Sequence, residues 1–255
     1  MRNKFKHMLE QGEVAFGLWI TIDSTDLVEV ASIIGFDWLL FDMEHAPLTI
    51  RDVQDLIQVV DAEKSTPIIR VAWNDPVLIK LALDVGAHGI LVPWVNSKEE
   101  AELAVKSVKY PPEGIRGYGP RRASMYGLKL KEYLEFVRQG EISLIIQIET
   151  KKALENLDEI LEVKGIDAAF IGPWDLSTSL GHIGEPSHPE VQEAIKLILD
   201  KCTDKGVPVG IYASPDLKTA LNYIKMGFKF IALGSDLDIL IKFGREVLSE
   251  LRKRA

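Results

Sequence analysis

The sequence contains a single cysteine, Cys202, and this scarcity excludes several classes of protein. One thiol cannot form an internal disulfide, so the chain is not a disulfide-stabilised scaffold. The sequence has no Cys/His cluster of the kind that binds structural zinc. It also lacks a Gly-x-Ser-x-Gly pentapeptide, which argues against a serine hydrolase with a nucleophile elbow.

The chain also lacks an excess of positive charge. It has 30 Lys and Arg against 38 Asp and Glu, which gives a net charge of −8. This balance argues against nucleic acid or an anionic membrane surface as a partner. No apolar run approaches the ~18 residues of a membrane span. Near the N-terminus, Glu10 and Glu13 stand where a signal peptide has its apolar core, so we expect a cytoplasmic protein.

None of the 20 lysines lies within or at the end of a predicted strand. An enzyme that forms a Schiff base needs a desolvated lysine of lowered pKa at such a place. Carbonyl chemistry in this protein would therefore need a metal ion as its electron sink.

The apolar segments predict eight strands that alternate with helices. Four strands follow a glycine suited to end a helix, and lie within 35–41, 86–92, 165–171 and 227–233; the other four are 15–20, 67–72, 143–149 and 208–213. Helical patterns cover 26–33, 49–62, 75–84, 97–108, 151–162, 189–204, 215–226 and 236–252, and Ser187 with Glu190 resembles a capping box. Eight such units predict a single α/β domain over 1–255, a (β/α)8 TIM barrel. An extra N-terminal helix at about 3–11 would cover the bottom of the barrel.

Two predicted strands end in a carboxylate. Glu149 ends the strand 143–149, and Asp175 follows the next strand along the chain. The C-terminal strand ends form the active-site face of such a barrel. Two acids from neighbouring strands make either a site for a hard cation or an acid/base pair. Gln147 lies two residues before Glu149 and thus on the same face of its strand.

Other ionisable residues accompany two further strands. Asp42, Glu44 and His45 lie within four residues at one strand end, where a histidine beside carboxylates can act as a base near neutral pH. The alternative is a helix cap with a histidine whose hydrogen bonds are satisfied. Arg70 lies inside an apolar strand and must be paired. It either forms a structural ion pair or meets a substrate carboxylate or developing oxyanion.

The connection 109–127 is long and rich in glycine, proline and arginine. Such loops in compact domains are usually functional or disordered, and the aromatic content argues against disorder. Arg116, Arg121 and Arg122 lie among its glycines. They either pair with acids at an interface between copies of the chain, or one of them, Arg122, binds the substrate.

Several motifs together resemble the HpcH/HpaI aldolase family over nearly the whole chain. They are Phe36-Asp-Trp-Leu-Leu-Phe-Asp42 with Glu44-His-Ala-Pro47, Arg70 through Trp73-Asn-Asp-Pro76, Tyr110-Pro-Pro-Glu-Gly-Ile-Arg-Gly117, Gln147-Ile-Glu-Thr150 and Phe170-Ile-Gly-Pro-Trp-Asp-Leu-Ser177. The resemblance implies a metal-dependent (class II) pyruvate aldolase on a modified TIM barrel, assembled as a homohexamer.

The resemblance also implies roles at the substrate. Glu149 and Asp175 would hold Mg²⁺, Mn²⁺ or Co²⁺, and pyruvate would chelate that metal. Arg70 would steady the enolate oxygen and Gln147 the bound 2-oxo acid. Trp174 stands where many members have a smaller or different side chain, and Met43 stands where many have glycine. A bulky Trp174 beside Asp175 would narrow the substrate pocket.

Two more roles follow from the same resemblance. His45, oriented by Asp42, would act as a base through a water molecule. Asp84 would join the site across a subunit interface, although its position alone indicates only an acid at a helix end.

The resemblance implies reversible cleavage of a 4-hydroxy-2-oxo acid to pyruvate and an aldehyde through a metal-bound pyruvate enolate. The same residues would serve a related metal-enolate lyase, such as an oxaloacetate decarboxylase. A non-catalytic barrel that serves binding or assembly is a third hypothesis, and the combined set of acids, base and cation argues against it.

Overall fold

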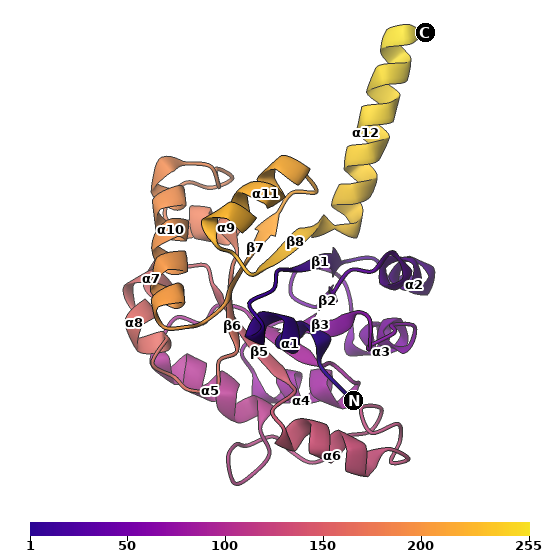
Figure 1. The fold of residues 1–255 in the computed structure, drawn as a ribbon, viewed down its shortest axis with the longest axis vertical. Helices are drawn as coiled ribbons and strands as arrows, with labels where there is room; N and C mark the ends of the chain where they lie inside the picture. The colour runs from indigo at the N-terminus through magenta and orange to yellow at the C-terminus, as the bar shows by residue number, and fades with distance from the viewer.

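The structure is a computed structural model that describes residues 1–255. Eight parallel strands close into a barrel in sequence order, with β1 paired to β8. This confirms the predicted TIM barrel (Figure 1). The strands are β1 Ala15–Ile20, β2 Trp38–Asp42, β3 Thr66–Arg70, β4 Gly89–Val92, β5 Ser143–Ile148, β6 Ala168–Ile171, β7 Val209–Ala213 and β8 Phe230–Ser235.

Most helices pack around the barrel, and they largely match the predicted segments. They are α1 Lys4–Glu10, α2 Thr25–Ile34, α3 Ile50–Gln58, α4 Pro76–Asp84, α5 Lys98–Val108, α6 Leu130–Arg138, α7 Lys151–Glu155, α8 Leu157–Ile160, α9 Pro173–Ser179, α10 Pro189–Asp204, α11 Leu217–Met226 and α12 Asp236–Arg254. The helix predicted over 151–162 is divided at Asn156. The helices α6 and α9 were not predicted.

Aromatic rings fill the interior of the barrel. Phe5 of α1 is fully buried and packs edge-on against Phe230, with 5.1 Å between ring centroids. Trp38 completes this layer, and it needs a glycine beside it, because a Cβ atom on Gly17 would lie 2.0 Å from its ring. The predicted N-terminal helix therefore closes the bottom of the barrel.

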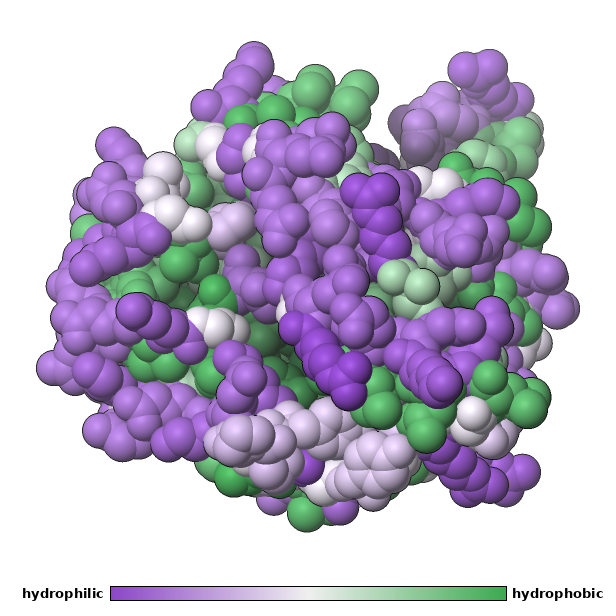
Figure 2. Space-filling view, turned by 60° about the horizontal axis from the view of Figure 1, so that its bottom comes forward, coloured by the Kyte–Doolittle hydropathy of each residue, from purple (hydrophilic) through white to green (hydrophobic).

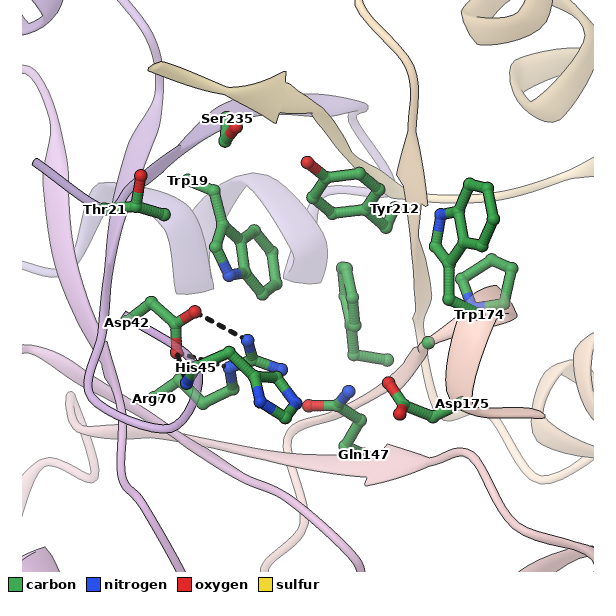
Figure 3. Close-up of a pocket in the computed structure, with 13 residues that line it drawn as sticks. Trp19, Thr21, Asp42, His45, Arg70, Gln147, Trp174, Asp175, Tyr212 and Ser235 are labelled. Atoms are coloured by element: carbon green, nitrogen blue, oxygen red, sulfur yellow. Dashed lines mark hydrogen bonds and ion pairs between the residues drawn. The ribbon is translucent and has the colours of Figure 1, made fainter. Parts of the chain in front are cut away.

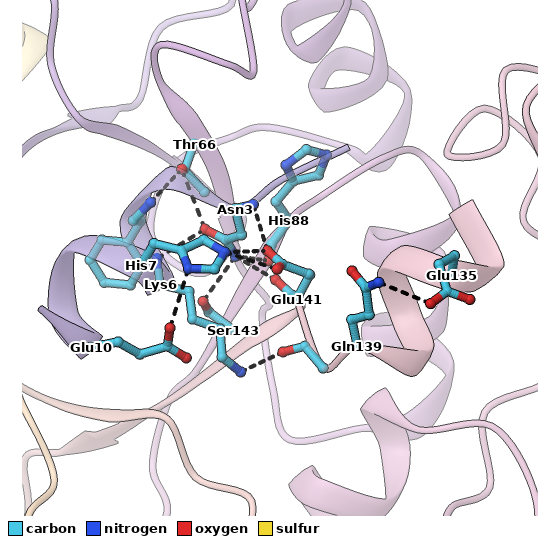
Figure 4. Close-up of polar contacts among 12 residues, drawn as sticks. Asn3, Lys6, His7, Glu10, Thr66, His88, Glu135, Gln139, Glu141 and Ser143 are labelled. Carbon is cyan, nitrogen blue, oxygen red and sulfur yellow. Dashed lines mark hydrogen bonds and ion pairs between the residues drawn. The ribbon is translucent and has the colours of Figure 1, made fainter. Parts of the chain in front are cut away.

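The side chain of Asn3 joins α1 to the strands that begin at the bottom of the barrel. Its amide donates hydrogen bonds to the carbonyl oxygens of His88 and Glu141 and to Ser143 Oγ, at 2.9, 2.7 and 3.0 Å (Figure 4). Its Oδ1 accepts from the Lys6 N–H and so caps the N-terminus of α1. Asn3 is itself fully buried.

The last helix differs from the others because it projects away from the barrel, as the yellow helix at the top of Figure 1 shows. Its large apolar side chains are exposed, for example Leu240 at 65% and Phe243 at 69%.

Elsewhere, hydrophilic residues cover most of the face seen in Figure 2, with smaller hydrophobic groups between them. None of the helices has both the length and the apolar character that crossing a bilayer requires.

Candidate active site

A pocket of about 250 Å³ opens at the C-terminal ends of the strands. It is lined by Trp19, Thr21, Asp42, His45, Arg70, Gln147, Phe170, Gly172, Pro173, Trp174, Asp175, Tyr212 and Ser235 (Figure 3). Six residues predicted as site residues line it, namely Asp42, His45, Arg70, Gln147, Trp174 and Asp175.

The wall opposite Gln147 and Asp175 consists of residues to which the family resemblance assigned no role. It includes Thr21, Ser235 and Tyr212, which lie on the far side of the pocket in Figure 3. The Thr21 and Tyr212 hydroxyls already donate to Asp236 and Asp238. Their position at the C-terminal ends of the first and last two strands was the signal that could have identified them.

Arg70 is paired with two acids from the end of β2. Strand pairing places Asp42 directly beside Arg70. The Arg70 Nε and Nη2 atoms donate to the two Asp42 oxygens at 2.8 and 2.7 Å, and Nη1 lies 2.9 Å from Glu44 Oε2. Burial opposes ionisation of Asp42, but the hydrogen bonds and charge of Arg70 hold the pKa of Asp42 below its usual value.

The guanidinium of Arg70 keeps free hydrogens despite this pairing. An arginine has five N–H donors. The two hydrogen bonds to Asp42 use one hydrogen on Nε and one on Nη2, and the contact with Glu44 is an ion pair without a hydrogen bond, so hydrogens remain on both Nη nitrogens. The group also lies over the ring of Trp19, 5.2 Å from its centroid. It is therefore both fixed in place and able to donate into the pocket.

His45 is exposed and is not hydrogen-bonded to Asp42 through its ring. Asp42 Oδ1 accepts from the backbone N–H groups of Glu44 and His45, at 3.0 and 3.3 Å. The His45 Nε2 atom lies 3.9 Å from Glu44 Oε1. Asp42 therefore orients the turn that carries His45. The prediction that Asp42 orients the His45 ring is wrong within this structure, because both oxygens of the carboxylate accept hydrogen bonds from Arg70.

Glu149 is 1% exposed at the end of β5. Its Oε1 accepts from the backbone N–H of Trp94 at 2.9 Å, and its Oε2 accepts from the Gln147 amide. Burial raises the pKa of Glu149 to about 8; the Trp94 N–H lowers it, and the nearby Asp175 and Glu44 charges raise it further. The charge of Arg70 lowers the pKa less than either acid raises it, so the carboxylate is held in place with little compensating positive charge.

The residues around Glu149 fit a divalent cation. The Oε1 atom of Gln147 is buried and has no hydrogen-bond partner, so an oxygen ligand remains available beside two carboxylates. Gly172 keeps the space open, since a Cβ atom there would lie 2.8 Å from Glu149 Oε2 and from Gln147 Nε2. Oxygen ligands of this kind suit Mg²⁺ and Mn²⁺.

Asp84 lies at the C-terminal end of α4, just before β4, and so at the opposite face of the barrel from the pocket. Its Oδ1 accepts from Arg116 Nη2 at 2.8 Å. Arg116 is buried, with its guanidinium 4.6 Å from the Tyr110 ring centroid and 5.8 Å from that of Tyr133. Within one chain, therefore, neither Asp84 nor Arg116 reaches the substrate pocket.

Arg122 also lies outside the pocket of its own chain. Its Nη1 donates to the Val85 carbonyl at 3.0 Å and its Nη2 to the Ile57 carbonyl at 3.3 Å. These carbonyls end α4 and α3, where helix dipoles favour a positive charge. The expected contact of Arg122 with substrate is thus absent within the chain, because its guanidinium is bonded to helix ends.

The model of the HpcH/HpaI aldolase/citrate lyase family matches residues 15–242. The chain belongs to this family, as its motifs indicated.

Two curated relatives share 42% identity with the chain. One is the 2-dehydro-3,6-dideoxy-6-sulfogluconate aldolase of Pseudomonas putida, over 97% of this chain and 96% of that protein. The other is the 4-hydroxy-2-oxo-heptane-1,7-dioate aldolase of Klebsiella pneumoniae, over 98% and 93%. A solved structure, an HpcH/HpaI aldolase/citrate lyase family protein from Burkholderia cenocepacia, has a TM-score of 0.92 and 34% identity, over 98% and 99%. The relatives are carbon–carbon lyases, which confirms the predicted class of enzyme.

Proposed function

We propose that the protein reversibly cleaves a 4-hydroxy-2-oxo acid to pyruvate and an aldehyde. The main support is the buried Glu149 carboxylate near Asp175, with Asp175 and the Arg70 guanidinium lining the pocket. This arrangement supplies oxygen ligands for a cation and a donor for a developing negative charge, which cleavage beside a keto group requires.

Glu149 and Asp175 are the residues that would hold Mg²⁺, Mn²⁺ or Co²⁺. When bound, such an ion polarises the keto group and offsets the excess of acids in the pocket. Gln147 fixes one oxygen of Glu149 and presents its own unpartnered Oε1 to the same space.

Arg70 donates its remaining hydrogens to the keto oxygen, where negative charge develops as the carbon–carbon bond breaks. Asp42 and Glu44 hold the guanidinium in advance, so little reorganisation is needed during the reaction.

His45 is the proposed base. It lines the pocket, and its exposed ring is open to water, which suits removal of the 4-hydroxyl proton through a bound water molecule.

We also propose a cytoplasmic homo-oligomer, with the hexamer implied by the family as the specific form. The projecting α12 exposes apolar side chains that a single copy does not cover, which supports association. Asp84 contributes to catalysis only if a neighbouring copy brings it to the pocket. Sedimentation that finds a fully active monomer would contradict this proposal.

Metal-dependent pyruvate release from a panel of 4-hydroxy-2-oxo acids tests the function. We expect turnover that EDTA abolishes and Mg²⁺, Mn²⁺ or Co²⁺ restores. Oxaloacetate belongs in the panel, because its decarboxylation as the fastest reaction would identify the alternative lyase. Full turnover after EDTA treatment, or a substrate adduct trapped by borohydride, would refute the metal-dependent mechanism. No turnover of any compound would favour a non-catalytic barrel.

A further inference from the structure

The turn between β4 and α5 contacts the Glu149 carboxylate through its backbone. Trp94 has a φ angle of 55°, in the left-handed region that non-glycine residues rarely occupy. In this conformation its N–H donates to Glu149 Oε1 at 2.9 Å. An unfavourable backbone conformation persists only where the surrounding contacts hold it, so the neighbours of Trp94 matter.

Asn96 supplies those contacts. Its side-chain amide donates to the Trp94 carbonyl at 2.8 Å, and its Oδ1 accepts from the hydroxyl of Thr150. Thr150 directly follows Glu149, so one side chain connects the strained turn to the backbone beside the carboxylate.

The backbone of Asn96 is held as well. Its N–H donates to Glu100 Oε2 at 2.6 Å, and its carbonyl accepts from Asn156 Nδ2 at 2.8 Å. Asn96 is therefore fixed by contacts with α5 and with the α7–α8 junction. The turn is anchored independently of Glu149.

We infer that Asn96 is a positioning residue for the cation site: it holds Trp94 in the conformation whose N–H orients Glu149, and it fixes Thr150 beside that carboxylate. The inference rests on the proposed role of Glu149 as a metal ligand. Residues that orient metal ligands typically change metal affinity by about 10–100-fold when they are removed.

The test is calorimetric titration of Mn²⁺ into the metal-free, full-length protein. Asn96→Ala should weaken Mn²⁺ binding by about 10–100-fold. Thr150→Val should also weaken it, because it removes the hydroxyl that bonds Asn96 and caps α7, whereas Thr150→Ser keeps both contacts and should restore binding. Circular dichroism checks that each variant is folded before titration.

Two further variants separate positioning from local stability. Ser97→Ala removes the N-cap of α5 next to Asn96 without touching Trp94 or Thr150, and should leave the affinity unchanged. Trp94→Gly keeps the N–H and accepts a positive φ, so its affinity should change only severalfold. An equal loss in Ser97→Ala and Asn96→Ala, or a larger loss in Trp94→Gly, would overturn the inference.

The proposed function and this inference fail in different ways. If Mn²⁺ binding to the unmodified protein is absent, or survives Glu149→Gln, the proposed cation site is wrong. If Glu149→Gln abolishes binding while Asn96→Ala binds as tightly as the unmodified protein, only the role of Asn96 is refuted.

Discussion

The two ends of the barrel differ in how their acidic side chains are paired with basic ones. At the bottom, α1 supplies one basic partner for each of three acids near the strand starts: Lys4 pairs with Asp37, Lys6 with Asp167 and His7 with Glu141, at 2.7, 2.7 and 2.9 Å. Two of these acids also accept backbone N–H groups of the barrel, from Phe16 and Leu144.

At the top, the acids outnumber the cations. Asp42, Glu44, Glu149 and Asp175 lie in or beside a pocket whose one arginine is Arg70. Burial raises the pKa of Glu44 and Glu149, as it also raises that of Asp167 at the bottom, so the two ends differ in the number of cations that accompany the acids. The comparison teaches that this fold balances charge at the closed end of the barrel and leaves negative charge in excess where we propose that a cation binds.

Arg70→Ala should produce the largest functional effect at the top. Loss of a donor to the developing oxyanion should lower kcat by about 10²-fold or more. Exchange of the pyruvate methyl protons in deuterated buffer reports the step directly. Arg138→Ala, which removes an exposed arginine on α6, is the matched control.

The same substitution leaves Asp42 and Glu44 without their cation, so some loss of stability is also expected. Exchange is therefore measured at a temperature where circular dichroism shows the variant folded. Proton exchange at the unmodified rate would refute the role of Arg70.

Asn3→Ala, at the bottom of the barrel, should lower the stability of the protein rather than its activity. It removes donors from two carbonyls and a hydroxyl, and an N-cap from α1, so the free energy of unfolding should fall by roughly 2 kcal/mol. Urea denaturation measures this change. Asn3→Asp keeps the cap acceptor but turns a buried carboxylate oxygen toward two carbonyl oxygens, so it should lose more than Asn3→Ala. A fall in kcat without a loss of stability would contradict the proposed division between the two ends.

The fold was predictable because its signals are local. Apolar strands that follow helix-ending glycines set the eight units, and Phe5 and Leu9 give α1 a buried face. The misses are local as well. The helix α6 carries a buried Tyr133 and Phe136 at helical spacing, but it follows an irregular loop. At α10, Pro189 occupies the first turn and His188 is the N-cap, so the capping box predicted from Ser187 was wrong.

The positions of the site acids were predictable from the parallel barrel, which gathers strand ends at one face. Their partners were not. The bonding of Asp42 to Arg70 depends on the register between β2 and β3, and the Trp94 N–H reaches Glu149 only through a positive φ angle. Neither feature has a signature in the sequence. The contacts of the Arg122 side chain depend on the conformation of the whole 109–127 loop, which the sequence does not specify locally.

The pH dependence of stability should report the buried carboxyl group of Glu149. Because the pKa of Glu149 rises from 4.5 to about 8 on folding, the folded state holds its proton more tightly than the unfolded state. Metal-free protein should therefore lose stability as the pH rises from about 5 to 8. We expect the melting temperature to fall across that range by roughly 2–4 °C for each kcal/mol by which ionisation of this group lowers the free energy of unfolding.

Glu149→Gln supplies the control for this effect. It keeps the size of the side chain but cannot titrate, so the fall in melting temperature between pH 5 and pH 8 should become smaller. An equal fall in the variant would show that other groups cause the dependence.

Arg122→Ala should have the smallest effect on catalysis, even though its place in a long loop rich in glycine and arginine suggested recognition of a substrate carboxylate. In the structure its guanidinium binds the Ile57 and Val85 carbonyls, and its backbone N–H donates to the Asp84 carbonyl. Removing it should loosen the turn and affect all aldehydes alike. Glyceraldehyde and tartronic semialdehyde form a matched pair, since they differ only in a CH₂OH group replaced by a carboxylate. In condensation with pyruvate, the ratio of their kcat/KM values should differ between the variant and the unmodified protein by less than about 2-fold. Such a change corresponds to less free energy than one hydrogen bond contributes. A rise in KM confined to tartronic semialdehyde would show instead that Arg122 contacts the carboxylate of a substrate bound to a neighbouring copy of the chain.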